Sequence, residues 1–398
     1  MQREVTYIII AATPTFKRMG GNGNMENSMK LKRYVTSYLK DYKKAKQDWN
    51  YEDGCVLRGA YLLYKATKDN FYIEFIKNYI DQYITKDGSI KRYDKEHFNI
   101  DSINTGKILL YLYEETLDEK YKKATYVLMN QLREQPRTKC NSFWHKKIYP
   151  NQIWLDGLYM AQPFYMAFET KFNNKKNYHD ILNQFNNVKL YLYNKEKKLY
   201  YHGYDESKIQ PWADKERGVS KNFWLRAMGW YLMAIVDTMD EMSEEIFELY
   251  KNLEFLFKEG IKGILQYQDQ ESKLFYQVID KADIENNYLE TSGSAMVAYA
   301  ILKGCRLKVL QKEKYQEIGE NILDSILRNK LIEKENQLIL SDICSVAGLG
   351  PGETRDGSVA YYLSEPIVSD DQKGVGALMM AYAEYLLVKQ DEGEYITF

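Results

Sequence analysis

Residues 222–240, NFWLRAMGWYLMAIVDTMD, decide the fold of this chain, because they could form a long helix yet carry apolar side chains on almost every face. A helix that is apolar all round must be buried all round. Five further stretches share this character and are rich in small residues: 52–67, 101–116, 154–169, 289–305 and 372–389. The sequence therefore predicts an inner set of fully buried helices.

A second kind of helix alternates with the first along the chain. These stretches carry charged residues on one face and apolar residues on the other: 28–46, 70–86, 118–135, 175–193, 242–259 and 312–330. Buried helices inside one-sided helices describe an all-α (α/α)6 toroid, a double ring of six helical hairpins. We predict this fold for residues 28–398 as a single domain, preceded by a flexible extension, 1–27.

Loop lengths predict where the site lies. Connections from inner to outer helices are short, whereas most connections from outer to inner helices are long: 87–100, 136–153, 194–221, 260–288 and 331–371. In such a ring the long loops and the N-termini of the inner helices gather at one mouth, and long loops in compact domains are usually functional. Strand-like alternation at 187–204 and 264–280 predicts short β-hairpins on this rim.

Composition excludes several classes of partner. The 398 residues carry 55 basic and 56 acidic side chains, so the net charge of -1 attracts neither nucleic acid nor an anionic membrane. The four cysteines and four histidines are scattered, which indicates no metal and no disulfide framework. We expect a soluble, cytoplasmic monomer or weak dimer without a cofactor. The 36 tyrosines suit a sugar site, but a biased genome explains them more simply.

Two acids stand at the starts of inner helices. Asp101, in Asn99-Ile-Asp-Ser, fits a helix N-cap and an active-site acid equally well. Asp156, in Trp154-Leu-Asp-Gly, precedes a stretch with almost no other polar group. Such a carboxyl group is capped, paired or partly desolvated; we favour desolvation, which favours the protonated form that a general acid needs.

Basic and aromatic residues lie in the same loops and helix starts. The candidate binding residues are His145, Lys146, Trp154, His202, Trp224, Arg226 and Trp230. Taken singly, each histidine or lysine fits a rim position and each tryptophan fits the core. Arg226 interrupts an apolar stretch, so it should pair with a carboxylate or bind an anion. Taken together, these residues describe an aromatic cup for a small acidic sugar.

The same motifs resemble a known family. Tyr149-Pro-Asn-Gln-Ile-Trp-Leu-Asp-Gly-Leu-Tyr-Met, Tyr201-His-Gly-Tyr-Asp-Glu-Ser, Trp224-Leu-Arg-Ala-Met-Gly-Trp-Tyr, Glu290-Thr-Ser-Gly-Ser-Ala and Gly374-Val-Gly-Ala are similar to motifs of the unsaturated rhamnogalacturonyl hydrolases, glycoside hydrolase family 105. The similarity runs in order from about residue 30. It implies the α/α toroid and removal of 4,5-unsaturated galacturonic acid from the non-reducing end of oligosaccharides, typically the disaccharide with rhamnose.

The resemblance also implies roles for individual residues. Asp156 matches the general acid and base, Asp101 the second acid that holds sugar hydroxyls, and His202 an active-site histidine. The remaining candidates match pocket residues around the unsaturated ring. An acid at this position would protonate C4 of the vinyl ether and let water add at C5, with no metal or redox cofactor.

Other functions remain open at this point. A relative that removes unsaturated glucuronyl ends from glycosaminoglycan or ulvan fragments is the nearest alternative. A sugar epimerase would need paired histidines, and a lanthionine-type cyclase would need a cysteine and histidine zinc site. A non-catalytic sugar-binding toroid could dispense with the acids, so Asp101 and Asp156 argue against it.

Overall fold

The computed structural model describes residues 22–243, 245–352, 354–394 and 396. The predicted inner helices are present as α2 (Tyr51–Thr67), α4 (Gly106–Thr116), α6 (Leu155–Phe172), α8 (Leu225–Asp240), α10 (Thr291–Arg306) and α13 (Gln372–Asp391). The outer helices are α1 (Asn22–Lys40), α3 (Asn70–Ile80), α5 (Glu119–Glu134), α7 (Tyr178–Leu192), α9 (Phe247–Ile264) and α11 (Lys312–Asn329). The (α/α)6 toroid is therefore confirmed.

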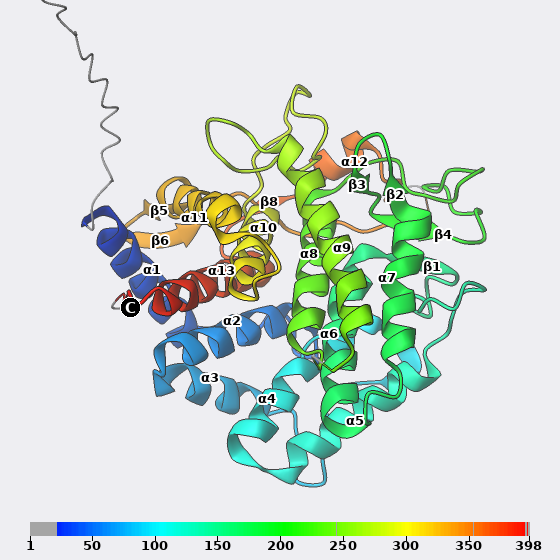
Figure 1. Cartoon of the computed structure of the whole chain (residues 1–398), viewed down its shortest axis with the longest axis horizontal. Helices are drawn as coiled ribbons and strands as arrows, with labels where there is room; N and C mark the ends of the chain where they lie inside the picture. The colour runs from blue at the N-terminus through cyan, green and yellow to red at the C-terminus, as the bar shows by residue number, and fades with distance from the viewer. Residues whose placement is uncertain (1–21, 244, 353, 395, 397–398) are drawn as a thin grey trace, which may run out of the picture.

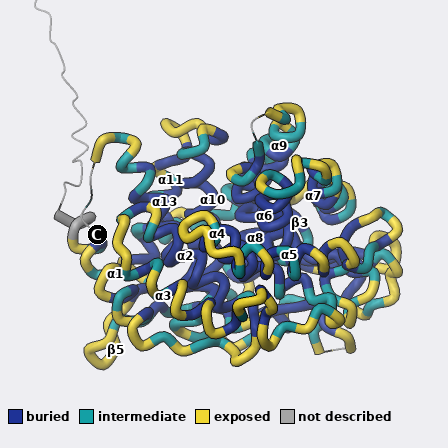
Figure 2. Tube along the Cα trace, turned by 90° about the horizontal axis from the view of Figure 1, so that it is seen from below, coloured by how far each residue is buried: buried dark blue, intermediate teal, exposed yellow. Residues whose placement is uncertain are grey.

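Burial separates the two rings as the patterns require. Every residue of α8 from Leu225 to Met239 is buried, whereas in α9 burial recurs every three or four residues, at Leu253, Leu256 and Phe257 and again at Gly260 and Ile261. In Figure 2 the buried segments gather in the middle of the molecule and the exposed segments surround them.

The ring closes where its first and last inner helices meet. In Figure 1 the red helix α13 lies beside the blue helix α2, and the two pack closely. Glycines allow the close approach: a Cβ on Gly59 would lie 2.7 Å from the Cβ of Met379, and a Cβ on Gly376 would lie 2.5 Å from the backbone of Cys55. Bulkier residues there would force the two helices apart.

The loops contain short pairs of strands. β1 (Gln152–Trp154) pairs with β4 (Gly203–Asp205), and β7 (Ile343–Cys344) pairs with β8 (Ile367–Val368). β2 (Tyr193–Asn194) and β3 (Leu199–Tyr200) form a hairpin, which confirms the prediction for 187–204. β5 (Leu331–Lys334) and β6 (Gln337–Leu340) form a hairpin that we did not predict.

The hairpin predicted at 264–280 is wrong. Its first arm is the end of α9 and the 3-10 turn η3 (Leu265–Tyr267), because the helical spacing of buried residues continues to Ile264. Its second arm makes isolated bridges elsewhere, from Val278 to Trp224 and from Tyr276 to Leu289. The apolar alternation of this segment thus serves packing against the start of α8.

Two predicted boundaries also differ from the structure. The buried stretch 101–116 begins within the 3-10 turn η2 (Ile100–Ile103), which follows the turn η1 (Lys95–His97), and becomes α-helical at Gly106. Helix α1 begins at Asn22, inside the predicted extension 1–27, and residues 1–21 lie outside the described part of the chain. Among the described residues, no helix is both long and apolar enough to cross a membrane.

Candidate active site

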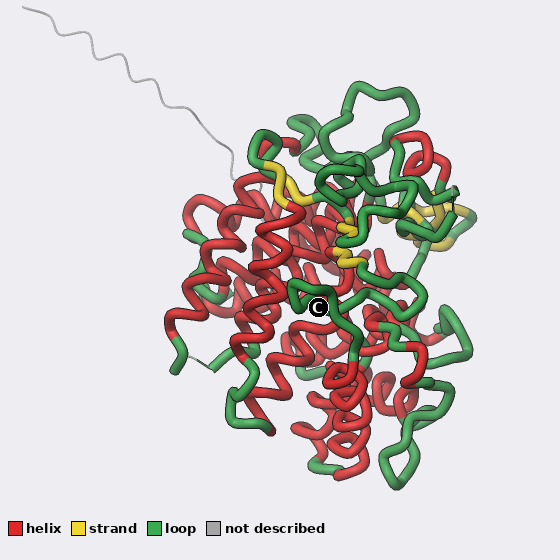
Figure 3. The backbone as a smooth tube through the Cα atoms, turned by 90° about the vertical axis from the view of Figure 1, so that its right-hand side faces the viewer, coloured by secondary structure: helices red, strands yellow, loops and turns green. Residues whose placement is uncertain are grey.

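Long loops bring the candidate residues to one end of the ring. In Figure 3 the strands lie in the upper half of the molecule, and many loops gather at the upper right. The β1–β4 pair places Trp154 opposite Gly203, and the N–H of Leu155 donates to the carbonyl of His202 at 3.0 Å. This pairing puts Asp156, in the first turn of α6, beside His202.

Asp156 and His202 form the first polar pair of the site. Nε2 of His202 lies 3.3 Å from Oδ2 of Asp156. The Asp156 side chain is 13% exposed and the His202 side chain is fully buried. On the other edge of the imidazole, Nδ1 of His202 lies 2.8 Å from the phenol oxygen of Tyr362, in α12 (Val359–Ser364).

Asp101 forms the second polar group, in the turn η2 before α4. Nζ of Lys146 donates to its Oδ2 at 2.7 Å, and Nε2 of His145 lies 3.4 Å from its Oδ1. Burial opposes the charge of Asp101, but the ammonium of Lys146 outweighs it and holds the pKa of Asp101 below its usual value. Burial lowers the pKa of His145 to about 4, so this imidazole is neutral at neutral pH.

Trp154 joins the two polar groups. Its indole stacks on His145 at 4.4 Å on one side of the site and meets His202 edge-on at 5.5 Å. Tyr149 stacks on the same indole at 4.9 Å, and Trp224 packs against His202 at 4.8 Å. Asp101, His145, His202 and Asp156 therefore lie around one aromatic wall, as the sequence predicted.

Arg226 is held by the protein itself. It is 1% exposed, and its guanidinium donates to the hydroxyl of Ser292 and to the carbonyls of Cys344 and Ser345 at 3.1, 2.5 and 3.3 Å. It also lies 5.0 Å from the centre of the Trp224 ring. Arg226 thus fastens the segment after β7 to the start of α8, where we had expected a carboxylate partner or a bound anion.

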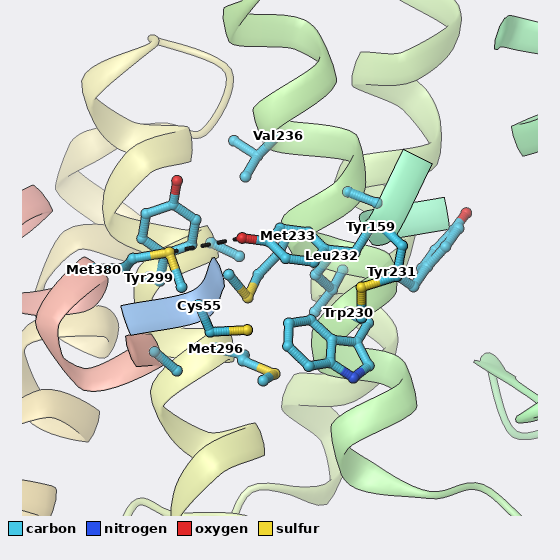
Figure 4. Packing of buried hydrophobic residues seen from close by; sticks show 14 of the residues in the cluster. Cys55, Tyr159, Trp230, Tyr231, Leu232, Met233, Val236, Met296, Tyr299 and Met380 are labelled. Carbon is cyan, nitrogen blue, oxygen red and sulfur yellow. Dashed lines mark hydrogen bonds between the residues drawn. The ribbon is translucent and has the colours of Figure 1, made fainter. Parts of the chain in front are cut away.

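Trp230 lies apart from this wall, deeper in the ring. Its indole is 1% exposed and stacks on Tyr159 at 4.8 Å. Figure 4 shows it among core residues from several inner helices, including Met296 of α10 and Met380 of α13. The predicted contact of Trp230 with a sugar stays a prediction.

The segment that Arg226 fastens covers Trp154. Leu349 packs in one apolar cluster with Trp154 and Trp212. A Cβ on Gly348 would lie 3.5 Å from the Trp154 ring and 3.3 Å from the guanidinium of Arg355. Residues that follow β7 therefore cover the site.

An open cavity adjoins the covered part of the site. It has a volume of about 430 Å³ and is lined by Asp101 and Lys146 together with Trp49, Tyr51 and Arg92. The pair of Asp101 and Lys146 therefore faces both the cavity and His145, so a sugar bound near the acids would have room for a linked residue.

Tyr149 and Tyr362 are site residues to which the sequence assigned no role. Tyr149 belongs to one of the quoted motifs, so a comparison of motifs could have identified it as a neighbour of Trp154. Tyr362 lies in 331–371, where neither helical nor strand periodicity points to a site. Among the described residues, no group of three or more histidine, cysteine, aspartate or glutamate side chains could hold a metal ion.

An α/α toroid with two buried carboxyl groups around tryptophan and histidine rings defines a class, the toroidal glycoside hydrolases. The profile of Glycosyl Hydrolase Family 88 matches residues 24–389, and the chain belongs to this family. The resemblance to family 105 is confirmed as well: a family 105 glycoside hydrolase from C. acetobutylicum ATCC 824 is 42% identical, with a TM-score of 0.85, over 90% of this chain and 98% of that one.

Further relatives are similar to the chain to different extents. A protein of Agrobacterium fabrum is 40% identical over 240 residues, which are 58% of this chain and 99% of that protein. The unsaturated rhamnogalacturonyl hydrolase YesR of Bacillus subtilis is 25% identical over 272 residues, 66% of this chain and 74% of that protein. An unsaturated glucuronyl hydrolase from Bacillus sp. GL1 shares the fold at 13% identity, with a TM-score of 0.62 over 94% of this chain and 99% of that one.

Proposed function

We propose that the protein removes 4,5-unsaturated galacturonic acid from the non-reducing end of oligosaccharides derived from rhamnogalacturonan. The observation that carries the proposal is the placement of Asp156, a largely buried carboxyl group 3.3 Å from His202 and next to Trp154. Only the protonated form of a carboxyl group can donate a proton to carbon. The similarity to YesR supports the galacturonyl substrate.

The reaction begins with proton transfer from Asp156 to C4. The electron pair of the C4=C5 double bond forms the new C4–H bond, and the positive charge that develops at C5 is shared with the ring oxygen. Water adds at C5 and gives its proton to the Asp156 carboxylate, which regenerates the acid. The resulting hemiketal opens by cleavage of the bond between C5 and the ring oxygen, leaving a ketone at C5.

Release of the linked sugar completes the sequence. Opening leaves a hydroxyl on C1 beside the glycosidic oxygen, so C1 becomes a hemiacetal carbon. Collapse of this hemiacetal forms an aldehyde at C1 and frees the linked sugar with its own hydroxyl. One water molecule is consumed in total, and no oxidant, reductant or metal takes part in any step.

The second polar group has a separate task. Asp101 is held as a carboxylate by Lys146 at 2.7 Å, so it accepts hydrogen bonds and does not donate a proton to the double bond. It would bind sugar hydroxyls, next to the aromatic wall that Trp154 forms with His145 and Tyr149. The division of labour between a neutral and an ionised carboxyl group is a general device of acid catalysis.

The proposal includes where and how the enzyme works. All four cysteines are free thiols, which suits a reducing compartment such as the cytoplasm. The substrate would be a small acidic oligosaccharide, typically unsaturated galacturonyl-rhamnose, bound by a monomer or weak dimer.

A substrate panel tests the proposal. Purified protein should destroy the ultraviolet absorbance of the enoate in unsaturated galacturonyl-rhamnose, with no metal added. Unsaturated glucuronyl disaccharides from glycosaminoglycans and ulvan form the second arm, and the saturated galacturonyl disaccharide is the control. Turnover of the glucuronyl arm alone would replace the proposed substrate, and turnover of neither arm would overturn the proposed function.

A further inference from the structure

Tyr362 is a buried polar residue that the proposed reaction does not yet use. It lies in α12 and is 0% exposed, as is His202, to which its phenol oxygen is joined at 2.8 Å. The phenol makes a second contact of another kind, because its ring lies parallel to Trp224 at 6.1 Å. The segment after β7 therefore sends one side chain into the centre of the site.

The position of one proton follows from this contact. Among the described residues, the phenol oxygen of Tyr362 has no hydrogen-bond partner other than Nδ1 of His202. If Nδ1 carried the imidazole proton, the phenol hydrogen would be buried without an acceptor, which is costly. The phenol therefore donates to Nδ1, and the imidazole proton lies on Nε2.

Nε2 is the atom that faces Asp156. It lies 3.3 Å from Oδ2, and among the described residues neither atom makes a hydrogen bond, so each is left free for the other to approach. A contact of this length is typical of a catalytic hydrogen bond that shortens when the substrate is bound. An N–H group at Nε2 stabilises the carboxylate of Asp156, whereas a lone pair at Nε2 would repel it.

We propose that Tyr362 is a positioning residue that fixes the tautomer of His202. The N–H group at Nε2 can then donate a hydrogen bond to the Asp156 carboxylate, which forms when C4 is protonated. The inference rests on the proposed function for its kinetic consequence, while the tautomer itself is independent of any substrate. In this arrangement the acid is strengthened at the moment of proton transfer, because the negative charge that develops on Asp156 meets a donor already in place.

The surroundings leave the phenol as the group that sets the tautomer. Asp156 and Tyr362 are the titratable groups in contact with His202, and the indoles of Trp154 and Trp224 pack against its imidazole. His145, which stacks on the same Trp154 indole, also interacts electrostatically with His202 but makes no hydrogen bond to it. Burial raises the pKa of Tyr362 well above its usual value, and the neighbouring Tyr361, Asp156, Asp356 and Cys344 raise it further. The phenol therefore keeps its proton throughout the working range of pH.

The first test is the pH dependence of turnover by Tyr362→Phe. Without the phenol, His202 can place its proton on Nδ1 and turn a lone pair towards Asp156, so the carboxylate formed in the reaction would face no donor. We expect kcat to fall about 10- to 100-fold, within the range of general acid catalysis, with KM almost unchanged. The basic limb of the kcat profile should move to higher pH, because a lone pair at Nε2 would disfavour the carboxylate.

The matched control is Tyr361→Phe. Its hydroxyl, on the same helix, donates to Glu365 and accepts from the N–H of Gly348, and it makes no hydrogen bond to His202. This variant loses a hydroxyl from the same helix, so it should keep the wild-type position of the basic limb. A shift of equal size in both variants would show that loosening of α12, and not the tautomer, moves the profile.

The second test reads the tautomer directly and needs no substrate. The chain has four histidines, so nitrogen resonances of 15N-histidine-labelled protein can be assigned by the signal lost in His202→Gln. Above neutral pH the wild type should show the His202 proton on Nε2, and Tyr362→Phe should gain the Nδ1–H form. A proton on Nδ1 in the wild type would overturn the inference.

The two tests separate this inference from the proposed function. If no unsaturated uronide is consumed, the function fails, but the nitrogen spectra still decide the role of Tyr362. If the wild type is active and Tyr362→Phe keeps both its basic limb and the Nε2 proton, the inference fails and the function stands. A melting temperature close to that of the wild type confirms that Tyr362→Phe is folded.

Discussion

Oδ2 of Asp156 lies 3.3 Å from Nε2 of His202, and the pairing of β1 with β4 fixes this distance. One residue comes from the first turn of α6 and the other from the turn between β3 and β4. Backbone hydrogen bonds at the mouth of the toroid therefore hold the two residues side by side. Their distance does not depend on an irregular loop. Because the backbone fixes this pair, single substitutions of its side chains can test their chemistry.

Asp156→Asn should abolish turnover while the protein stays folded. The amide has the shape of the carboxylic acid but cannot transfer a proton to C4, so we expect a loss of about 10²- to 10⁴-fold or more in kcat. The decay of the enoate absorbance measures the rate, and the melting temperature checks folding. A variant that retained a near-normal rate would rule out Asp156 as the acid.

Lys146→Met should shift the acid limb of kcat/KM upwards. The pKa of Asp101 lies below its usual value because Lys146 outweighs burial, so the carboxylate that binds hydroxyls is present above this pKa and is lost as pH falls through it. Without the ammonium the limb should move by about one pH unit or more. Lys147→Met, at an exposed neighbour, is the control and should not move it; an unmoved limb in Lys146→Met would contradict the role of this ion pair.

His145 should make the fold less stable in mild acid. Its folded pKa is about 4, below the ordinary value of 6.5, because burial disfavours the charged imidazole. The stability that this neutral side chain contributes is complete above pH 6.5 and is lost as pH falls towards 4. Between pH 6.5 and 5 the loss should reach about 2 kcal/mol.

Urea unfolding at several pH values measures that contribution. His145→Gln should lose less free energy of unfolding than the wild type over this pH interval. His97→Gln, at a histidine whose side chain is 76% exposed, should behave like the wild type. Equal slopes for all three proteins would show that His145 is not the group that titrates.

Arg226→Lys should destabilise the protein although the charge is kept. A lysine cannot bond to Ser292 and to the carbonyls of Cys344 and Ser345 with the same planar group. We expect a loss of about 2 kcal/mol in the free energy of unfolding, since hydrogen bonds from charged donors are strong. Arg33→Lys, at a side chain that is 64% exposed, is the matched control, and equal stability of the two variants would refute the fastening role.

The toroid could be predicted because its two kinds of helix differ in a property that a sequence records directly, which is whether one face or every face is apolar. Residues 222–240 and 242–259 show this contrast side by side. The segment 264–280 could not be predicted in this way. The carbonyl of Gln277 accepts from the N–H of Leu225 and the N–H of Ile279 donates to the carbonyl of Phe223, and such distant partners leave no local pattern.

The site was predictable to the extent that its residues sit at helix starts. Asp156 and Trp154 follow this rule, whereas His202 lies in the turn between β3 and β4 and joins them through the β1–β4 pair. Trp230 lies six residues after Trp224, about 9 Å further along the axis of α8, so it falls in the core layer with Tyr159. Tyr362 lies in a segment without periodicity. The placement of this segment depends on β7, on Arg226 and on the residues that cover Trp154.

The seam between α2 and α13, where Gly59 and Gly376 allow close contact, has a consequence for synthesis of the protein. The partners of this seam are separated by most of the chain, so the ring stays open until the segment that forms α13 has left the ribosome. A nascent chain stalled before that point would expose the apolar flank of α2 and would depend on chaperones. In a circular permutant whose new termini lie in an outer loop, α2 and α13 would be close in sequence. Their contact could then form early in synthesis.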